Sequence, residues 1–195
     1  IRGDPKHFTS SKLMCWVAAD RGARLAEMRD ELEFAARWQS VAEEIKNDIL
    51  ENSLDERGVF CQHYDTDALD ASVLLTVLTR FLPPDDERIR ATVLAVADEL
   101  TEDGLVLRYR VSETDDGLAG EEGTFTICSF WLVSALVEIG EVDRGRELCE
   151  KLLAGGFRAL IAFDEFQDIG RIDGLDGLLR SHIQHHGEVA SYVFA

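Results

Sequence analysis

The segment FTICSFWLVSALVEI, residues 125–139, is apolar on nearly every side when drawn as a helix, which is typical of a helix buried on most faces. Residues 13–19 and 73–82 have the same character. Each of these segments precedes one with a single apolar stripe at helical spacing. The stripes are Trp38, Val41, Ala42, Ile45 and Ile49; Ile89, Val93, Val96 and Leu100; and Leu148, Cys149, Leu152 and Leu153. This threefold alternation predicts an all-α fold.

The candidate starts of the three buried helices are evenly spaced. Ser10, Asp67 and Thr124 each have a side chain that can cap free N–H groups, and each lies 57 residues after the one before it. A regular period predicts a repeated helical hairpin. Hairpins stacked around an axis, with buried helices inside, would form part of an α/α toroid. An ordinary helical bundle satisfies the same periodicities.

Composition excludes some partners. The chain has 195 residues with 46% apolar content, which is enough for one domain with a core. The formal net charge of -18 would repel nucleic acids and anionic lipids, so neutral or cationic partners are favoured. Since neither a signal segment nor a membrane-spanning run is recognisable, we expect a soluble, cytoplasmic protein. The sequence indicates no oligomeric state.

Residues that could carry redox or metal chemistry have simpler explanations. The four cysteines, Cys15, Cys61, Cys128 and Cys149, stand apart in apolar surroundings and are predicted to be reduced, buried thiols. His182, His185 and His186 lack a third ligand at a suitable spacing, so we predict neither a metal site nor a cofactor. Trp16, Trp38 and Trp131 could stack on sugar rings, but their places within helical stripes favour core packing.

Several short strings resemble those of glycoside hydrolase family 15, of the bacterial glucoamylase and trehalase type. They are RGDPKHFT (2–9), SKLMCWVA (11–18), DALDAS (67–72), FLPPDD (81–86), DGLV (103–106) with RYR (108–110), and EGTF (122–125) with CSFWLV (128–133). The resemblance covers residues 1 to about 153. It implies a partial (α/α)6 toroid of about three hairpins over residues 1–154. Residues 155–195 would form a divergent C-terminal segment of unknown fold.

The resemblance also implies a chemistry. Related enzymes hydrolyse α-linked glucose with inversion, using an acid and a base carboxyl group about 6.5–9.5 Å apart and a water nucleophile. The family's acid belongs to a Trp-Glu pair directly before a string that opens here with Ile1-Arg2-Gly3, so it is expected one position before Ile1. The base is expected after the third hairpin, near a Gly-Asn-Phe-Pro-Gln-Ala string that this chain lacks. Glu165 stands nearest and is either the base or a solvated surface carboxylate.

Four residues match sugar-binding positions of the family. Arg108 corresponds to a guanidinium that holds sugar hydroxyls, although an ion pair with Glu113 or Asp103 is the alternative. Glu122 could accept hydrogen bonds from glucose or favour a positive helix end. Arg2 and His7 are implied to lie near the pocket, with a structural hydrogen bond as the alternative for His7. Asp67 and Asp70 are predicted to serve a helix start.

Three functions remain open from the sequence. The leading one is a fragment of an inverting α-glucoside hydrolase for trehalose or short α-glucans, inactive alone because its carboxyl pair is incomplete. The others are a non-catalytic saccharide-binding or regulatory module and a truncated product without function. A divergent ending, a chimera or a change of reading frame would each account for residues 155–195, and we favour the last.

Overall fold

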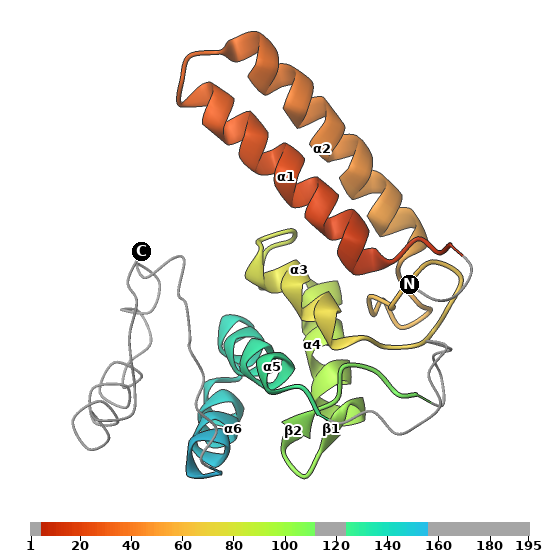
Figure 1. The fold of residues 1–195 in the computed structure, drawn as a ribbon, viewed down its shortest axis with the longest axis vertical. Coiled ribbons are helices and arrows are strands. Elements are labelled where there is room, and N and C mark those ends of the chain that lie inside the picture. Colours follow the sequence, from red (N-terminus) through yellow and green to blue (C-terminus); the bar gives the residue numbers. More distant parts are fainter. Residues whose placement is uncertain (1–4, 112–123, 156–195) are drawn as a thin grey trace, which may run out of the picture. The chain divides into compact units, whose positions relative to one another are not determined.

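The computed structural model describes residues 5–111 and 124–155 (Figure 1). The helices are α1 (Thr9–Glu27), α2 (Leu32–Asn52), η1 (Ala71–Leu74) continuing as α3 (Leu75–Leu78), α4 (Glu87–Glu99), α5 (Thr126–Glu138) and α6 (Val142–Ala154). A two-stranded hairpin, β1 (Thr101–Glu102) and β2 (Leu105–Val106), follows α4. The chain divides into two compact units, Ile1–Leu152 and Leu153–Ala195, and the first holds the features below.

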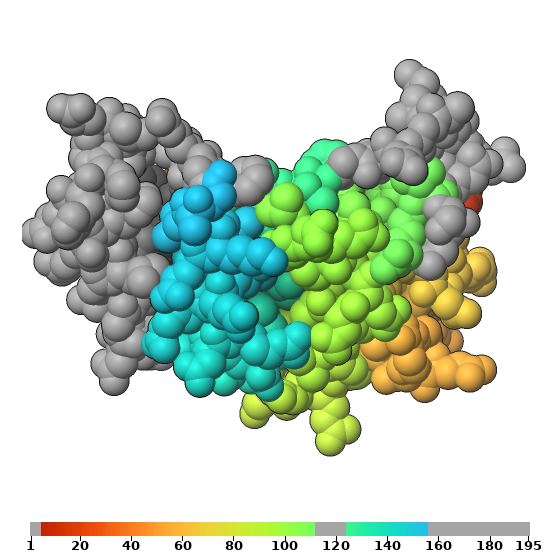
Figure 2. Space-filling view, turned by 90° about the horizontal axis from the view of Figure 1, so that it is seen from below, coloured from red at the N-terminus to blue at the C-terminus, as the bar shows by residue number. Residues whose placement is uncertain are grey.

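The helices form three successive hairpins. α1 packs along α2, η1 packs on α4, and Gly145 of α6 lies against Val133 and Val137 of α5. η1 contacts both α1 and α5, so the middle hairpin lies between the other two (Figure 1). We call the first helices of the hairpins (α1, η1 with α3, and α5) the inner helices and the second helices (α2, α4 and α6) the outer helices. The outer helices follow one another across the face in Figure 2, and Arg144 of α6 pairs with Asp98 of α4 at 2.9 Å. The all-α class is confirmed, and this order agrees with part of an α/α toroid.

Aromatic and aliphatic side chains from all three hairpins form one core. The ring of Trp16 meets that of Phe81 edge-on at 4.9 Å between centroids, and Phe60 approaches Phe81 at 6.1 Å. The predicted stripe of α4 is confirmed, since Ile89, Val93, Val96 and Leu100 are at most 1% exposed. Truncation of a buried Phe such as Phe81 to Ala costs about 3–5 kcal/mol of folding free energy.

The inner helices α1, α3 and α5 end in the same way. The chain turns through a left-handed residue after each helix: Asp30 (φ 59°), Arg80 (φ 61°) and Gly140 (φ 84°). The following N–H then bonds five residues back, as in Phe81 to Thr76 at 2.9 Å and Glu141 to Leu136 at 2.8 Å. This is the Schellman motif, which satisfies carbonyls left free at a helix end. The motif also ends the helix predicted over residues 73–82 at Leu78, so the predicted helix was too long.

Backbone carbonyls from later loops reach the starts of the first two inner helices. The first helical N–H of α1, from Thr9, bonds to the carbonyl of Gln62 at 3.0 Å. That of η1, from Ala71, bonds to the carbonyl of Arg108 at 2.6 Å. Each of these helices is therefore fastened at its start by the loop that leads to the next one.

The predicted caps and their regular spacing were wrong. The capping positions are Phe8, Asp70 and Phe125, and the inner helices begin at Thr9, Ala71 and Thr126. Side-chain capping occurs only at Asp70 among these three positions, where Oδ1 accepts from the Ser72 N–H at 2.7 Å. Since loop carbonyls serve the starts of α1 and η1, a capping side chain is not required at Ser10 or Asp67.

Two burial predictions also need correction. Cys15 is exposed, because Leu13, Trp16 and Ala19 turn the opposite side of α1 to the core. Burial raises the pKa of Cys61 and Cys128 to about 11, as expected for inert thiols. It also raises the pKa of Cys149. Trp38 is 44% exposed rather than part of the core, since its ring lies over Gly22 on the surface of the α1–α2 hairpin. Trp16 is buried as predicted, and Trp131 is half-buried.

The turn between the two strands was missed from the sequence. Asp103 (φ 51°) and Gly104 (φ 79°) both adopt left-handed conformations, as a two-residue type I′ hairpin requires. Leu105 and Val106 form β2, directly after this turn. Among the helices described, none has both the length and the apolar character to cross a membrane.

Candidate functional site

The candidate site is built on the starts of the first two inner helices and the loops that fasten them. Phe8 pairs with His63 in an isolated antiparallel bridge, and Asp70 pairs with Tyr109 in the same manner. These bridges bring His7 beside the 62–64 loop and Arg108 beside the start of η1. His7 thus lies just before the start of α1, whereas Arg108 lies in the loop that reaches the start of η1, at the place that Gln62 takes in the first repeat.

Asp70 holds Arg108. Arg108 Nε lies 3.7 Å from Asp70 Oδ2, and the same carboxylate accepts from Gln62 Nε2 at 3.5 Å. The Asp70 side chain is 6% exposed, whereas that of Arg108 is 50% exposed. The guanidinium also lies 5.8 Å from the centroid of the Tyr109 ring. Arg108 is therefore anchored along one edge and keeps donors available to a solvent-side ligand.

The observed ion-pair partner of Arg108 is not the predicted Asp103. The structure pairs Arg108 with Asp70 rather than Asp103, because the bridge between Asp70 and Tyr109 brings the two chains together. Glu113 lies outside the described residues. The sequence hypothesis assigned Asp70 to the helix start alone, and the structure adds this second role.

His7 rests on a polar cluster around Asp48. Its ring stacks on that of Tyr64, with centroids 5.4 Å apart and planes inclined by 27°. Asp48 Oδ2 accepts from both Tyr64 Oη and Lys12 Nζ at 2.8 Å. The hydrogen bond from Lys12 lowers the pKa of Asp48 most, followed by that from Tyr64. Burial is the main cause that raises the pKa of Tyr64, followed by its hydrogen bond to Asp48. The backbone carbonyl of His7 also accepts the Tyr64 N–H at 3.0 Å.

His63 fixes the loop that carries Tyr64. Its Nε2 lies 3.1 Å from Lys6 Nζ, and its Nδ1 contacts the carbonyl oxygen of Tyr64. An ammonium can only donate, so Nε2 accepts and the proton lies on Nδ1, from which it reaches the carbonyl. The ring of Phe8 packs edge-on against His63 at 5.7 Å. These contacts hold residues 6–8 against the 62–64 loop.

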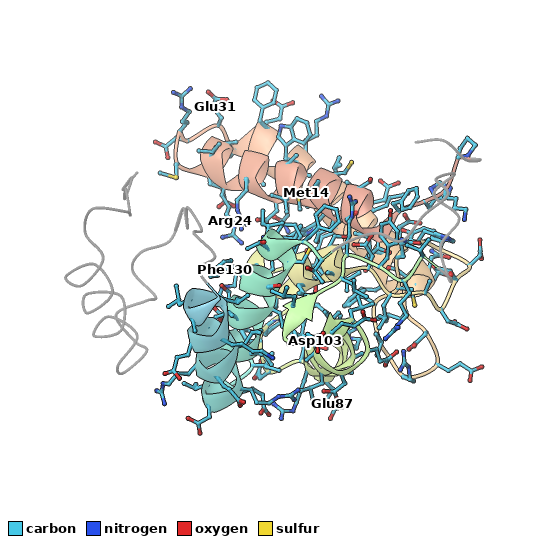
Figure 3. All side chains as sticks on the ribbon, turned by 60° about the horizontal axis from the view of Figure 1, so that its bottom comes forward. Met14, Arg24, Glu31, Glu87, Asp103 and Phe130 are labelled. Carbon is cyan, nitrogen blue, oxygen red and sulfur yellow. The ribbon has the colours of Figure 1, made fainter. Side chains whose placement is uncertain are left out.

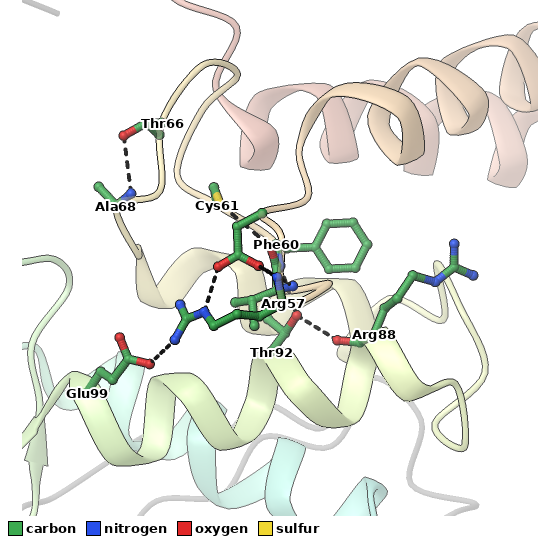
Figure 4. Close-up of polar contacts among 10 residues, drawn as sticks. Arg57, Phe60, Cys61, Thr66, Ala68, Arg88, Thr92 and Glu99 are labelled. Carbon is green, nitrogen blue, oxygen red and sulfur yellow. Dashed lines mark hydrogen bonds and ion pairs between the residues drawn. The ribbon is translucent and has the colours of Figure 1, made fainter.

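The other side of the 53–68 loop is tied to the outer helix α4 (Figure 4). The Phe60 N–H donates to Thr92 Oγ1 at 3.0 Å, and that hydroxyl donates to the Arg88 carbonyl at 2.7 Å. Arg57 donates to Asp55 at 2.8 Å and to Glu99 at 2.6 Å. The 53–68 loop, which carries the stacking partner of His7, is therefore supported by helix α4.

Three predicted site residues, Arg2, Glu122 and Glu165, lie outside the described residues, as do His182, His185 and His186. No cluster of three His, Cys, Asp or Glu side chains within residues 5–111 and 124–155 could hold a metal ion. Sequence analysis missed Tyr64 and Asp48, since nothing in their spacing shows that a loop residue stacks beneath His7. The Asp-x-Ser spacing of Asp70 and Ser72 was a usable signal for the observed cap.

Comparisons with known proteins agree on one family. The model of glycosyl hydrolases family 15 matches residues 1–156. The chain is 72% identical over 154 residues to a trehalase of Mycolicibacterium smegmatis, and 68% identical over 167 residues to a trehalase of Mycobacterium tuberculosis. These matches cover 79% and 86% of this chain but 23% and 25% of the relatives, so the chain spans about a quarter of their length.

A solved structure shows the same fold. A glycosidase variant in complex with glucose aligns with a TM-score of 0.66 at 21% sequence identity. The alignment covers 76% of this chain and 38% of the glycosidase. The fold of this chain therefore matches part of a longer protein.

Proposed function

Because this chain belongs to glycosyl hydrolases family 15, we propose that it forms part of an inverting α-glucoside hydrolase that acts on trehalose. The observation that carries this proposal is the identity of 68–72% to two trehalases over most of the chain. Short α-glucans are the alternative substrates. The chain spans about a quarter of these relatives, so the activity belongs to a larger assembly of the fold.

The proposed task of the described part is to hold one glucose unit. Arg108 presents a fork of donors that orients sugar hydroxyls without exchanging a proton, while Asp70 fixes its position. His7, stacked on Tyr64, lies just before the start of α1. Arg2 and Glu122 complete the proposed sugar contacts.

The chemistry needs two carboxyl groups about 6.5–9.5 Å apart, one to protonate the leaving oxygen and one to activate water. We assign the acid to a Glu directly before Ile1 in the complete enzyme. Glu165 is the candidate base within this chain. Without its acid the chain should not hydrolyse trehalose, because loss of either partner is severe in this mechanism.

A graft tests the proposal. Residues 1–153 of this chain replace the matching segment of the M. smegmatis trehalase, and release of glucose from trehalose and from maltose is measured. We expect trehalose hydrolysis within about tenfold of the parent enzyme. Arg108→Lys in the graft should lower kcat/KM by about 100-fold, since a bidentate contact is lost.

The matched control is Arg110→Lys, because Arg110 is a neighbouring arginine that pairs with Glu102 at 3.6 Å. It should retain activity. A graft that folds, as judged by its melting curve, but hydrolyses only maltose would contradict the assignment to trehalose. Hydrolysis of trehalose by the isolated 195-residue chain at the parent's rate would contradict its assignment as a part.

A further inference from the structure

Tyr64 is the residue on which the exposed ring of His7 rests. The two ring planes are inclined by 27° with centroids 5.4 Å apart, and the Tyr64 N–H donates to the His7 carbonyl at 3.0 Å. His7 precedes α1 and is not part of a helix, so no helical backbone restricts its side chain. The stacked Tyr64 ring therefore limits the orientations that the His7 ring can adopt.

The Tyr64 ring is itself held by both helices of the first hairpin. Its hydroxyl donates to Asp48 Oδ2 of α2 at 2.8 Å, and the same oxygen accepts from Lys12 Nζ of α1 at 2.8 Å. The Lys12 ammonium also lies 5.6 Å from the centroid of the Tyr64 ring. Since α1 and α2 pack along each other, the far end of the Tyr64 side chain is fixed to a helical hairpin as well as to its own loop.

This cluster adds little to the packed core. The side chains of Lys12 and Asp48 are 31% and 40% exposed, and Tyr64 is half-buried. Ion pairs of that exposure stabilise a fold only weakly, because water screens the charges and the side chains lose conformational freedom. The main effect of the cluster is to hold the His7 ring in one arrangement at the surface, as supporting residues do behind a binding site.

The loop that carries Tyr64 also reaches the support of Arg108. Gln62, two residues before Tyr64, donates to Asp70 Oδ2 at 3.5 Å, and Arg108 Nε lies 3.7 Å from the same oxygen. The 62–64 loop therefore contacts the supports of both candidate sugar contacts, His7 and Arg108.

We propose that Tyr64, held by Asp48 and Lys12, is a positioning residue that presents the His7 ring to the glucose unit. The ring nitrogens of His7 meet sugar hydroxyls, and Tyr64 acts through His7 without touching the sugar. A His7 ring without this support would have to be ordered when the sugar binds, which lowers affinity. The inference rests on the proposed function, since it takes His7 as a sugar contact.

A double-mutant cycle in the M. smegmatis trehalase graft tests this role. His7→Ala, Tyr64→Leu and the double variant are compared by kcat and KM for trehalose and for maltose. We expect each single variant to raise KM about tenfold with kcat within about twofold of the graft, because a contact present throughout the reaction is lost or loosened. The double variant should raise KM no further than His7→Ala does, because Tyr64 then has no ring to position.

Tyr64→Phe separates the stack from its anchor. Phenylalanine keeps a ring beneath His7 but removes the bond to Asp48, so we expect KM to rise by only about threefold. This variant also replaces Tyr64→Leu in the cycle if the leucine variant does not fold.

Phe34→Leu is the matched control, because it changes an aromatic side chain to leucine on the helix that carries Asp48. Phe34 is 55% exposed and lies two residues after the start of α2. It is three residues beyond Glu31, which Figure 3 labels in the connection between α1 and α2, whereas His7 lies before the other end of α1. The KM of the Phe34→Leu graft should be unchanged.

Increases in KM that multiply in the double variant would overturn the proposal, since Tyr64 would then act independently of His7. A graft in which neither Tyr64 variant changes KM would also overturn it. A graft that hydrolyses maltose alone but shows the expected coupling would remove trehalose from the proposed function and leave the role of Tyr64 in place. Trehalose hydrolysis without the coupling would remove that role and leave the function. A folded graft that hydrolyses neither sugar would overturn both.

Discussion

The carboxylate of Asp70 accepts the Ser72 N–H with one oxygen and faces Gln62 and Arg108 with the other. One buried side chain thereby starts a helix, ties it to the preceding loop and aims a candidate sugar-binding residue. Three residues earlier, Asp67 is exposed and caps no inner helix. Sequence pattern alone favoured Asp67, because the 57-residue spacing pointed to it, whereas the bridge to Tyr109 selects Asp70.

Asp70→Ala should therefore lower the free energy of unfolding by about 1–3 kcal/mol, since it removes a cap and leaves the buried Ser72 N–H without its acceptor. Urea denaturation of the full chain measures the effect. Asp67→Ala is the control and should stay within about 0.5 kcal/mol of the parent. Equal losses in the two variants would contradict the assignment of the cap.

The Asp48 cluster predicts a dependence of stability on pH. Because the pKa of Asp48 is lowered in the folded state from its ordinary value of 3.8, its ionised form stabilises the fold above that value. The contribution should be lost as the pH falls from about 4 through the lowered pKa. Asp48→Asn should remove this part of the acid destabilisation, as measured by urea unfolding between pH 6 and pH 3.

The control for that measurement is Asp85→Asn, which changes an exposed carboxyl in the Pro-Pro-Asp-Asp loop. Its stability should follow the parent chain across the whole range. If Asp48→Asn and the parent lose stability in parallel below pH 4, the bonds from Lys12 and Tyr64 do not matter for folding.

At the level of elements, the periodicity of the sequence predicted the helices better than their ends. The stripe of α4 was predicted correctly, because four apolar residues at helical spacing need only a core on one side. The helix expected over residues 73–82 was too long, since an arginine gives no sequence signal for the left-handed turn that Arg80 makes. The Asp103-Gly104 hairpin carried a recognisable turn signal that was not used.

The Schellman ends predict substitutions of opposite sign at equivalent positions. Asp30→Gly should raise the free energy of unfolding by about 0.5–1 kcal/mol, because glycine adopts φ 59° without a Cβ penalty. Gly140→Ala should lower it by about 1 kcal/mol or more, although an added Cβ would meet no atom within 4 Å. Thermal or urea unfolding distinguishes the two, and changes of the same sign would show that contacts outweigh backbone conformation there.

At the level of the whole molecule, the fold class followed from the alternation of buried and half-buried helices, and the family from short strings spread over residues 2–133. The candidate site was only partly accessible to that reasoning. Arg108 and His7 were found from the resemblance, whereas their supports, Asp70, Tyr64 and Asp48, depend on loops that meet only in three dimensions. The exposure of Cys15 was mispredicted because local apolar context does not show whether a neighbouring helix is present.

The boundary between the two units gives a prediction at this scale. The core residues in the described part of the chain all lie within Ile1–Leu152, so a chain ending at residue 154 should unfold cooperatively. Its free energy of unfolding should lie within about 1 kcal/mol of the full chain, as measured by urea denaturation followed by circular dichroism. A broad, non-cooperative transition for the shortened chain would mean that residues 155–195 belong to the same folding unit.

The fastening of each helix start by a later loop has a consequence for synthesis. During synthesis, the carbonyl that accepts the first helical N–H of α1 becomes available only after Gln62 has been added. The carbonyl that does so for η1 becomes available only after Arg108 has been added. Each of the first two inner helices is thus completed only when the loop that leads to the next one has been made. A nascent chain that ends before Gln62 or before Arg108 therefore leaves the corresponding helix start without that acceptor.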